Sequence, residues 1–359
     1  MKHNEQISVC PFEISQASEE QWNEIPLQFR DGTVYQTWGY GAVRCRKGRL
    51  CNLVLKKDCE IRAAAQVRIL TVPVIAAGSA YVHCGPLWKL RDRPDDPDSL
   101  RQIVAALKRE FVDRRGLSLR IRPNAYGIDE DAKTIESILE GEGYRTIGAP
   151  GETIILDLTP SLDLLRLGMD RRWRANLKHA ETQEYRIIQG NELQLFDRFA
   201  PIYTEMMDRK RFDCDISLED YRIVQRDLPD SQKPGIVLCE INNEAVAGFL
   251  FSKIGETAIG MLAATSNRGI KLNAAYLVWW NSLKWLKAEG LRRLDLGGID
   301  KAVAPGPYQF KMGLAAKCGR TTTCIGPYEA CSNLISLCAL RFGVRLRKRV
   351  HHLCHLLGG

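Results

Sequence analysis

Two stretches of the chain share the same order of apolar and polar positions. Residues 107–116 place apolar side chains at helical spacing and end at a glycine, and residues 117–123 then alternate apolar and polar positions as a strand does. Residues 277–290 repeat the helical pattern up to a second glycine, and residues 291–297 again have the pattern of a strand. The pattern therefore predicts, at two places, a helix that stops at glycine and leads into a strand.

A β-hairpin is predicted before each of these helices. Residues 63–87 contain two apolar runs around Ala77-Gly78-Ser79, and residues 245–264 contain two around Ile254-Gly255-Glu256. The two glycines that end the helices lie about one domain length apart in the sequence. The simplest interpretation is a duplicated α/β unit.

The junction between the two halves carries a strand and a basic helix. Residues 153–159 have the pattern of a strand that ends before Pro160, and Ser161 is a favourable N-cap for one helix over residues 162–184. The cationic side chains of this predicted helix are Arg166, Arg171, Arg172, Arg174 and Lys178. We therefore place the domain boundary near residue 156.

The C-terminal segment differs from both halves. Residues 327–359 are first apolar and then basic, which predicts an amphipathic basic helix. The sequence thus predicts a first domain over residues 1–155, a second domain over residues 156–326 and a C-terminal helix.

The composition fits a two-domain globular protein. The chain has 359 residues, of which 45% are hydrophobic and 26% are charged. No apolar stretch has the length of a signal-peptide core or a membrane-spanning helix, so we expect a cytoplasmic protein. The formal net charge of +8 favours an anionic partner such as phosphate, RNA or an acidic membrane surface, without choosing among them.

The twelve cysteines form neither a disulfide framework nor a metal-ligand pattern. They are scattered without a C-x-x-C pair, so we expect mostly reduced thiols packed as small hydrophobic groups. Cys324, Cys331 and Cys338 recur every seven residues, but Gly326 and Pro327 interrupt the helix that would align them. We therefore expect neither a metal ion nor another cofactor.

The segment with the most chemical content is residues 294–300, Leu-Asp-Leu-Gly-Gly-Ile-Asp. A strand that runs into Gly297 and Gly298 lets a ligand approach the backbone amides closely. Residues 307–314 follow after a short loop and carry three side chains that could line the same cleft: Tyr308, Phe310 and Lys311. The alternative is a purely structural Gly-Gly turn, capped by Asp295 and followed by a solvated lysine.

Residues 295–314 resemble the D-x-G-G-x and F-K-x-G motifs near the end of the Fem family of aminoacyl-tRNA-dependent transferases. Earlier segments are similar to further motifs of that family, in the family's order. These are residues 36–44 for its Q-S-W segment, residues 81–86 for its Y-x-x-x-G-P, residues 120–123 for its R-x-x-P strand and residues 171–180 for its K-x-R-x-x-I-x-K-A helix. The ordered set covers roughly residues 30–320.

The resemblance implies two tandem acetyltransferase-like (GNAT-like) domains, each a mixed, mainly antiparallel sheet flanked by helices. It also implies transfer of an amino acid from aminoacyl-tRNA to an amine of a peptidoglycan precursor, either a lipid- or nucleotide-linked muropeptide or a related peptide. Because aminoacyl-tRNA is already an activated ester, positioning and oxyanion stabilisation could supply most of the acceleration.

The resemblance also suggests roles for individual residues. Lys311 matches the family's lysine near the reaction centre, where its charge would face the oxyanion or the tRNA terminus. The acceptor's phosphates are assigned by position to Arg44, Arg209 and Arg211. The further substrate-binding candidates are Trp38, Tyr308, Phe310, Gly297 and Gly298. Asp295 is either the anchor of the glycine turn, which we favour, or a proton acceptor.

Departures from the family leave the acceptor and the donor open. Residues 259–261 lack the aromatic side chain expected after the second hairpin, and the F-K motif ends in Gly-Leu, so the acceptor could lie outside peptidoglycan. An acyl-CoA-dependent N-acyltransferase is the first alternative, although its pyrophosphate loop would fall in residues 267–274, which hold a single glycine. A non-catalytic nucleic-acid- or lipid-binding protein is the second.

Two basic surfaces and two histidines complete the expectations. The helix predicted over residues 162–184 either faces tRNA or is a solvated surface. The C-terminal helix either contacts an anionic membrane or packs on its domain. His83 and His179 are isolated in the sequence, so we expect structural rather than catalytic roles for them.

Overall fold

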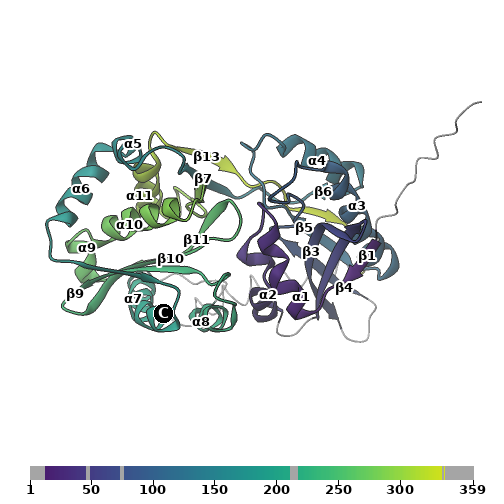
Figure 1. Ribbon diagram of the computed structural model, residues 1–359, viewed down its shortest axis with the longest axis horizontal. Helices are drawn as coiled ribbons and strands as arrows, with labels where there is room; N and C mark the ends of the chain where they lie inside the picture. Colours follow the sequence, from purple (N-terminus) through teal and green to yellow (C-terminus); the bar gives the residue numbers. More distant parts are fainter. Residues whose placement is uncertain (1–12, 46–48, 73–76, 211–216, 334, 336–359) are drawn as a thin grey trace, which may run out of the picture.

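The computed structural model describes residues 13–45, 49–72, 77–210, 217–333 and 335. These residues form two sheets of seven strands, one in each half of an elongated molecule (Figure 1). None of the described helices is long and apolar enough to cross a membrane.

The first sheet has the order β1-β2-β3-β4-β5-β14-β6. Its strands are β1 (Glu13–Gln16), β2 (Arg49–Lys57), β3 (Glu60–Val72), β4 (Ala77–His83), β5 (Ser118–Arg122), β14 (Tyr328–Ala330) and β6 (Arg145–Thr146). Only β4 and β5 run parallel among the pairs described, and the other neighbours are antiparallel. The helices of this half are α1 (Glu19–Glu24), α2 (Trp38–Arg44), α3 (Pro97–Leu107), which continues as a π-helix over Lys108–Arg114, and α4 (Ala132–Gly141).

The second sheet has the order β13-β7-β12-β11-β10-β9-β8. Its strands are β13 (Gly319–Thr323), β7 (Glu152–Asp157), β12 (Arg293–Asp295), β11 (Thr257–Thr265), β10 (Glu244–Ser252), β9 (Gly235–Ile241) and β8 (Arg186–Gly190). Here β11 and β12 are the parallel pair. The helices are α5 (Leu162–Gly168), α6 (Arg171–Glu181), α7 (Leu193–Lys210), α8 (Leu218–Asp227), α9 (Asn267–Lys271), α10 (Ala274–Ala288) and α11 (Pro305–Ala315).

The predicted duplication is confirmed. In each half an antiparallel meander leads into a helix that ends near a glycine, Gly116 or Gly290, and then into the strand of the parallel pair. The sheets are mixed and mainly antiparallel, with helices on both faces, as expected. The turn predicted at residues 254–256 is also confirmed, because it joins β10 to β11.

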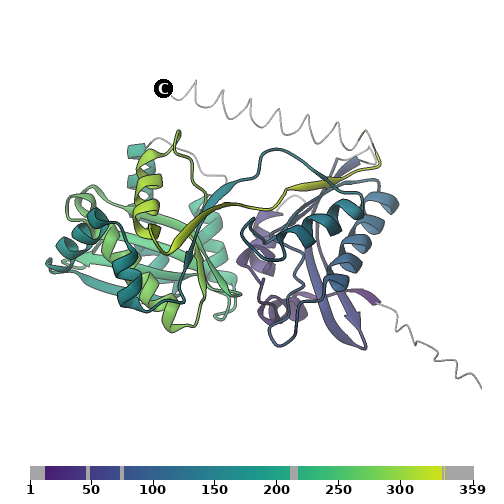
Figure 2. The ribbon, with the colours of Figure 1, turned by 90° about the horizontal axis from the view of Figure 1, so that it is seen from above.

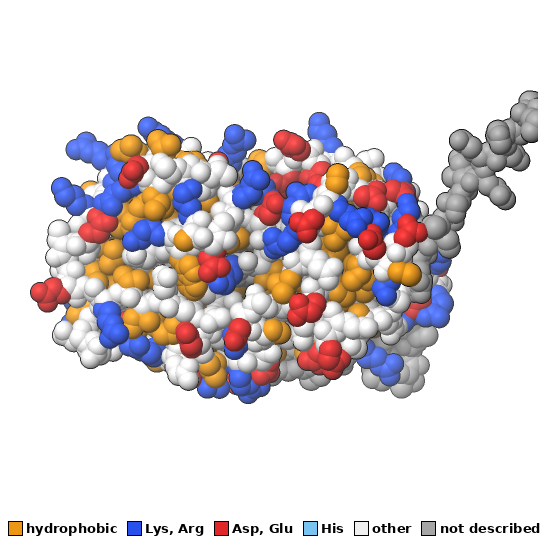
Figure 3. Space-filling view, in the orientation of Figure 1, with side chains coloured by type: hydrophobic (Ala, Val, Ile, Leu, Met, Phe, Trp, Pro, Cys, Tyr) orange, Lys and Arg blue, Asp and Glu red, His pale blue; other side chains and the backbone are white. Residues whose placement is uncertain are grey.

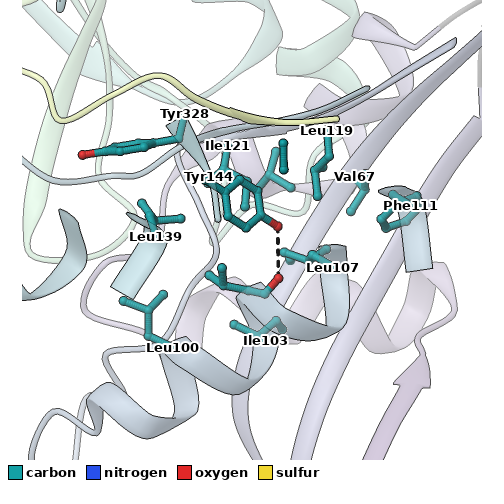
Figure 4. Packing of buried hydrophobic residues seen from close by; sticks show 14 of the residues in the cluster. Val67, Leu100, Ile103, Leu107, Phe111, Leu119, Ile121, Leu139, Tyr144 and Tyr328 are labelled. Carbon is teal, nitrogen blue, oxygen red and sulfur yellow. Dashed lines mark hydrogen bonds between the residues drawn. The ribbon is translucent and has the colours of Figure 1, made fainter. Parts of the chain in front are cut away.

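The alternation of apolar positions explains how each sheet binds helices on both faces. In β9, Val237 and Cys239 pack in a cluster with α10, whereas Ile236 and Leu238 pack in a separate cluster with α7. In the first half, the core between the sheet and α3 is closed by Tyr144, whose hydroxyl donates to the carbonyl oxygen of Val104 at 3.0 Å (Figure 4). The buried phenol thus fills the core and has its polar atom satisfied.

The two halves exchange one strand with each other. β7 follows β6 in the chain but lies in the second sheet, between β12 and β13. β14 follows β13 but lies in the first sheet, between β5 and β6. Figure 2 shows the two segments that cross between the halves. The chain therefore passes from the first sheet to the second before Glu152, ahead of the domain boundary expected near residue 156. The C-terminal segment expected from residue 327 onward begins with β14, a strand of the first sheet.

Two local predictions are wrong. The helix predicted over residues 162–184 is two helices, because Met169 has extended backbone geometry and Asp170 caps α6 with its side chain. Ala77-Gly78-Ser79 is not a turn but the start of β4. At Gly78 a Cβ atom would lie 2.3 Å from the carbonyl oxygen of Leu70, so the glycine serves close strand contact. Most of the predicted C-terminal helix, from residue 336 onward, lies outside the described residues.

Candidate functional site

A cavity of about 670 Å³ lies between the two halves. The first domain contributes side chains from α2, β3, β4 and β5, and the second contributes β11, the end of β12 and α11. Both parallel strand pairs, β4–β5 and β11–β12, therefore supply walls of this cavity. We refer to it as the interdomain cavity.

The glycine turn of the second domain is held by Asp295, the last residue of β12. Its carboxylate accepts hydrogen bonds from the hydroxyl of Tyr126 at 2.8 Å, from the hydroxyl of Thr153 and from the amide of Gly297 at 2.8 Å. Gly297 has a φ of +78°, in the left-handed region that side-chain-bearing residues rarely adopt. Tyr126 belongs to the first domain, so this buried carboxylate also joins the two halves at the cavity wall.

Lys311 lies beside this turn on α11. Its ammonium group donates to the carbonyl oxygens of Gly297 at 3.1 Å and Gly298 at 2.9 Å. Burial lowers the pKa of Lys311, and the nearby carboxylate of Asp295 opposes part of that shift. An ammonium group has three N–H donors, so two are used by the turn and one remains for a ligand.

A second cavity, of about 550 Å³, lies in the second domain between β11, α10 and α11. Its wall carries aromatic side chains from Trp173, Tyr276, Trp279 and Phe310 and cationic side chains from Arg172, Arg209, Lys210 and Lys311. The ring of Phe310 lies within 5.7 Å, centroid to centroid, of those of Trp173, Tyr276 and Trp279. We refer to it as the aromatic cavity. Lys311 and Trp279 line both cavities, so the two meet there.

The residues predicted from sequence separate into three groups. Those that line the interdomain cavity are Arg44, Asp295, Gly297, Gly298 and Lys311. Arg209 and Phe310 line the aromatic cavity, where Arg209 donates to the side chain of Asn267 and the carbonyl oxygen of Thr265. Trp38 packs at a small hydrophobic cluster of the first domain, Tyr308 is half-buried on α11 outside both cavities, and Arg211 lies outside the described residues.

Several residues of the interdomain cavity are missing from the sequence-based candidates. Arg68, Arg122, Tyr126 and Thr153 all line it. His83, expected to be structural, lines it too. No three His, Cys, Asp or Glu side chains of the described part of the chain are grouped as metal ligands would be.

The sequence matches no family model. No curated protein is significantly similar to it in sequence. The crystal structure of FemX, however, superimposes on the chain with a TM-score of 0.74 at 13% identity, covering 90% of this chain and 98% of FemX. The chain has the fold of FemX. The fold expected from the Fem-family motifs, two tandem GNAT-like domains, is thereby confirmed.

Other solved structures share this twin-domain fold less closely than FemX does. The C-terminal domain of a protein from Agrobacterium fabrum, assigned as a lysylphosphatidylglycerol synthetase, gives a TM-score of 0.55 at 14% identity over 92% of this chain and 98% of that one. A conserved protein of unknown function from Bacteroides thetaiotaomicron gives 0.56 at 10% identity over 89% and 99% of the two chains. At these identities the likeness to FemX and to both other structures shows the fold, and the function must be argued from the site.

Proposed function

We propose that the protein is an acyltransferase that moves an amino acid from aminoacyl-tRNA to an amine of a peptidoglycan precursor or a related peptide. The observation that carries the proposal is the position of Lys311, which lies where the interdomain cavity meets the aromatic cavity. Two substrates that entered from the two cavities would meet at this ammonium group. The FemX-like fold supports the same reaction class by analogy.

In the proposed reaction the acceptor amine attacks the ester carbonyl of the donor. A C–N bond forms, the C–O bond to the tRNA ribose breaks, and the proton lost by the amine ends on the ribose hydroxyl. The remaining N–H of Lys311 stabilises the oxyanion of the tetrahedral intermediate. Asp295 acts as the anchor of the glycine turn that holds Lys311, because its carboxylate is already engaged by three protein donors.

The aromatic cavity suits the 3′ end of a charged tRNA. Its rings offer stacking surfaces for a base, and Arg172 and Lys210 offer charge for phosphates. Outside the cavity, Arg171 and Lys178 are exposed on α6, and Lys and Arg side chains gather over α5 and α6 (Figure 3). These features support the proposal that this side of the second domain receives tRNA.

An acyl-CoA donor fits the same region poorly. If CoA were the donor, its pyrophosphate would have to bind to the backbone amides at the start of α9, within residues 267–274. The amide of Asn267 instead donates to the carboxylate of Glu205 at 2.8 Å, and the amide of Gly269 donates to the hydroxyl of Ser266 at 3.0 Å. A carboxylate at this point repels a pyrophosphate, so we propose tRNA rather than CoA as the donor.

The test is a transfer assay with total radiolabelled aminoacyl-tRNA and acceptor extracts. We expect label in the acceptor fraction that RNase treatment abolishes and that added CoA thioesters do not replace. Transfer from acyl-CoA that RNase leaves untouched would establish the alternative donor, and transfer from neither donor would contradict the proposal. A tRNA donor implies a cytoplasmic enzyme, and membrane contact through residues 336–359 stays a prediction.

A further inference from the structure

The cavity-facing side of the first sheet carries an ordered set of polar side chains. In β3 the core receives Val67 and Ile69, in β4 Ala80 and Val82, and in β5 Leu119 and Ile121. The alternate positions, which are Arg68, Tyr81, His83, Arg120 and Arg122, therefore share the opposite face. Register pairs Arg68 with Tyr81, Tyr81 with Arg120, and His83 with Arg122. All of them except Arg120 line the interdomain cavity.

The arginines of this face differ in their partners. Arg120 forms an ion pair with Glu329 at 2.8 Å. Arg122, two residues further along the same strand, has no carboxylate partner in the described structure and donates to the thiol sulfur of Cys324 at 3.2 Å. Arg68 has no described ion pair either, and its guanidinium lies 4.9 Å from the centre of the Tyr81 ring. Two half-buried guanidinium groups thus face the cavity, and no carboxylate of the described residues forms an ion pair with either of them.

His83 adds a polar atom without a partner to the same face. Its ring stacks between those of Tyr35 at 4.6 Å and Tyr81 at 5.4 Å, which fixes its orientation. The buried Nδ1 atom makes no hydrogen bond in the described structure. Burial, together with the charges of Arg68, Arg122 and Arg44, holds the pKa of His83 well below its usual range, so the ring is neutral.

We propose that Arg68 and Arg122 form a subsite for an oxyanion of the acceptor, a carboxylate or a phosphate, and that Nδ1 of His83 forms a hydrogen bond to the same ligand. A buried charge without a counter-ion is costly, and a guanidinium matches the two oxygens of such a group. The inference rests on the proposed function only in taking the ligand to be the acceptor. It implies an acceptor that presents an oxyanion to the first domain and its amine to Lys311.

Direct binding measurements test the subsite without turnover. The probes are N-acetyl-alanyl-alanine, its C-terminal amide and inorganic phosphate, titrated calorimetrically into the full chain. We expect saturable binding of the acid or of phosphate, and at least tenfold weaker binding of the amide, since the amide loses the hydrogen bonds between a charged oxygen and the guanidinium groups. Preference for the acid identifies a carboxylate and preference for phosphate a phosphoryl group. Equal binding of acid and amide without phosphate binding, or no saturable binding of any probe, overturns the inference.

Variants assign the binding to the named residues. Arg68→Gln and Arg122→Gln should each weaken the anionic probe about tenfold or more. His83→Phe, which retains the stacked ring, should weaken it less. Arg49→Gln is the matched control, because Arg49 is exposed on β2 away from the cavity, and it should bind as the wild type does. Unchanged binding by both cavity variants overturns the subsite, and the comparison of acid with amide on the wild type needs no variant to fold.

The transfer assay separates this inference from the proposed function. With the subsite in place, Arg68→Gln and Arg122→Gln raise the apparent KM for the acceptor fraction more than they lower kcat. Arginine-dependent anion binding without transfer from any donor leaves the subsite standing and refutes the proposed function. RNase-sensitive transfer with an unchanged acceptor KM in both variants supports the proposed function and refutes the subsite.

Discussion

Replacement of Lys311 by methionine tests the centre of the proposed mechanism. Methionine keeps an unbranched side chain that is one heavy atom shorter than that of lysine, and it removes the three N–H donors. Two of these hold the carbonyl oxygens of Gly297 and Gly298, and the third is the one available to the oxyanion. Loss of one oxyanion donor typically lowers kcat about 100- to 1,000-fold, or about 2.7–4 kcal/mol in the barrier. We expect a loss of that size, with a smaller change in the acceptor KM.

The pH dependence separates charge from shape. Because burial lowers the pKa of Lys311, the ammonium group loses its proton at a lower pH than an exposed lysine does. The kcat of the wild type should therefore fall as pH rises through the lowered pKa. Lys311→Arg keeps its charge, so its activity, reduced by the poorer fit of the planar group, should lack this fall.

Single-turnover transfer from radiolabelled aminoacyl-tRNA, corrected for uncatalysed ester hydrolysis, measures these rates. Lys317→Met is the matched control, since Lys317 is exposed just beyond the end of α11 and lines neither cavity. A folded Lys311→Met variant with kcat within about twofold of the wild type would refute the mechanism. The same alkaline profile in the wild type and Lys311→Arg would refute the role of the charge.

Three further predictions concern stability. Asp295→Asn should lower the free energy of unfolding by about 1–3 kcal/mol, because an amide oxygen cannot replace both carboxylate oxygens, and Asp300→Asn in the next loop should change it little in the same urea titration. Burial raises the pKa of Asp31 to about 7, against the opposing effects of three backbone hydrogen bonds and the charge of Lys89. The native state therefore keeps a proton that the unfolded chain releases near pH 4. The free energy of unfolding should fall by about 1.4 kcal/mol per pH unit as the pH rises from there toward 7. Asp31→Asn should remove this slope, and a slope that persists in the variant would refute the assignment to Asp31. A chain that ends at residue 323 lacks β14 and the buried side chains of Ile325 and Tyr328. Its thermal unfolding should lose the cooperative transition that a chain ending at residue 335 keeps. Equal melting of the two chains would count against the role of β14.

Local signals in the sequence account for what could be predicted. Glycine ends both repeated helices, and the Gly297-Gly298 turn follows a strand, because these features depend on a few neighbouring residues. The strand exchange could not be predicted in this way. β7 follows β6, an edge strand of the first sheet, and β14 follows β13, an edge strand of the second. Nothing in the sequence near β7 or β14 specifies that each joins the other sheet.

The candidate site was partly accessible for the same reason. Lys311 and Asp295 stand out through a contiguous motif, whereas Arg68 and Arg122 come from different strands and meet only through register. The alternation of apolar and polar positions in β3, β4 and β5 was the available signal for them. The family resemblance also proposed Trp38 and Tyr308, which the structure places outside both cavities.

The exchanged strands have a consequence for the order of synthesis. A ribosome makes β5 and β6 early, but the strand that lies between them, β14, is among the last described residues of the chain. In the first sheet, β5 and β6 therefore lack the strand that pairs with both of them, β14, until residue 330 has been made. The second sheet is completed before the first, since its last strand in the chain, β13, ends at Thr323. A chain whose synthesis stops before β14 thus has an incomplete sheet in the domain that was made first. The unpaired strand edge of that sheet is of the kind that promotes aggregation.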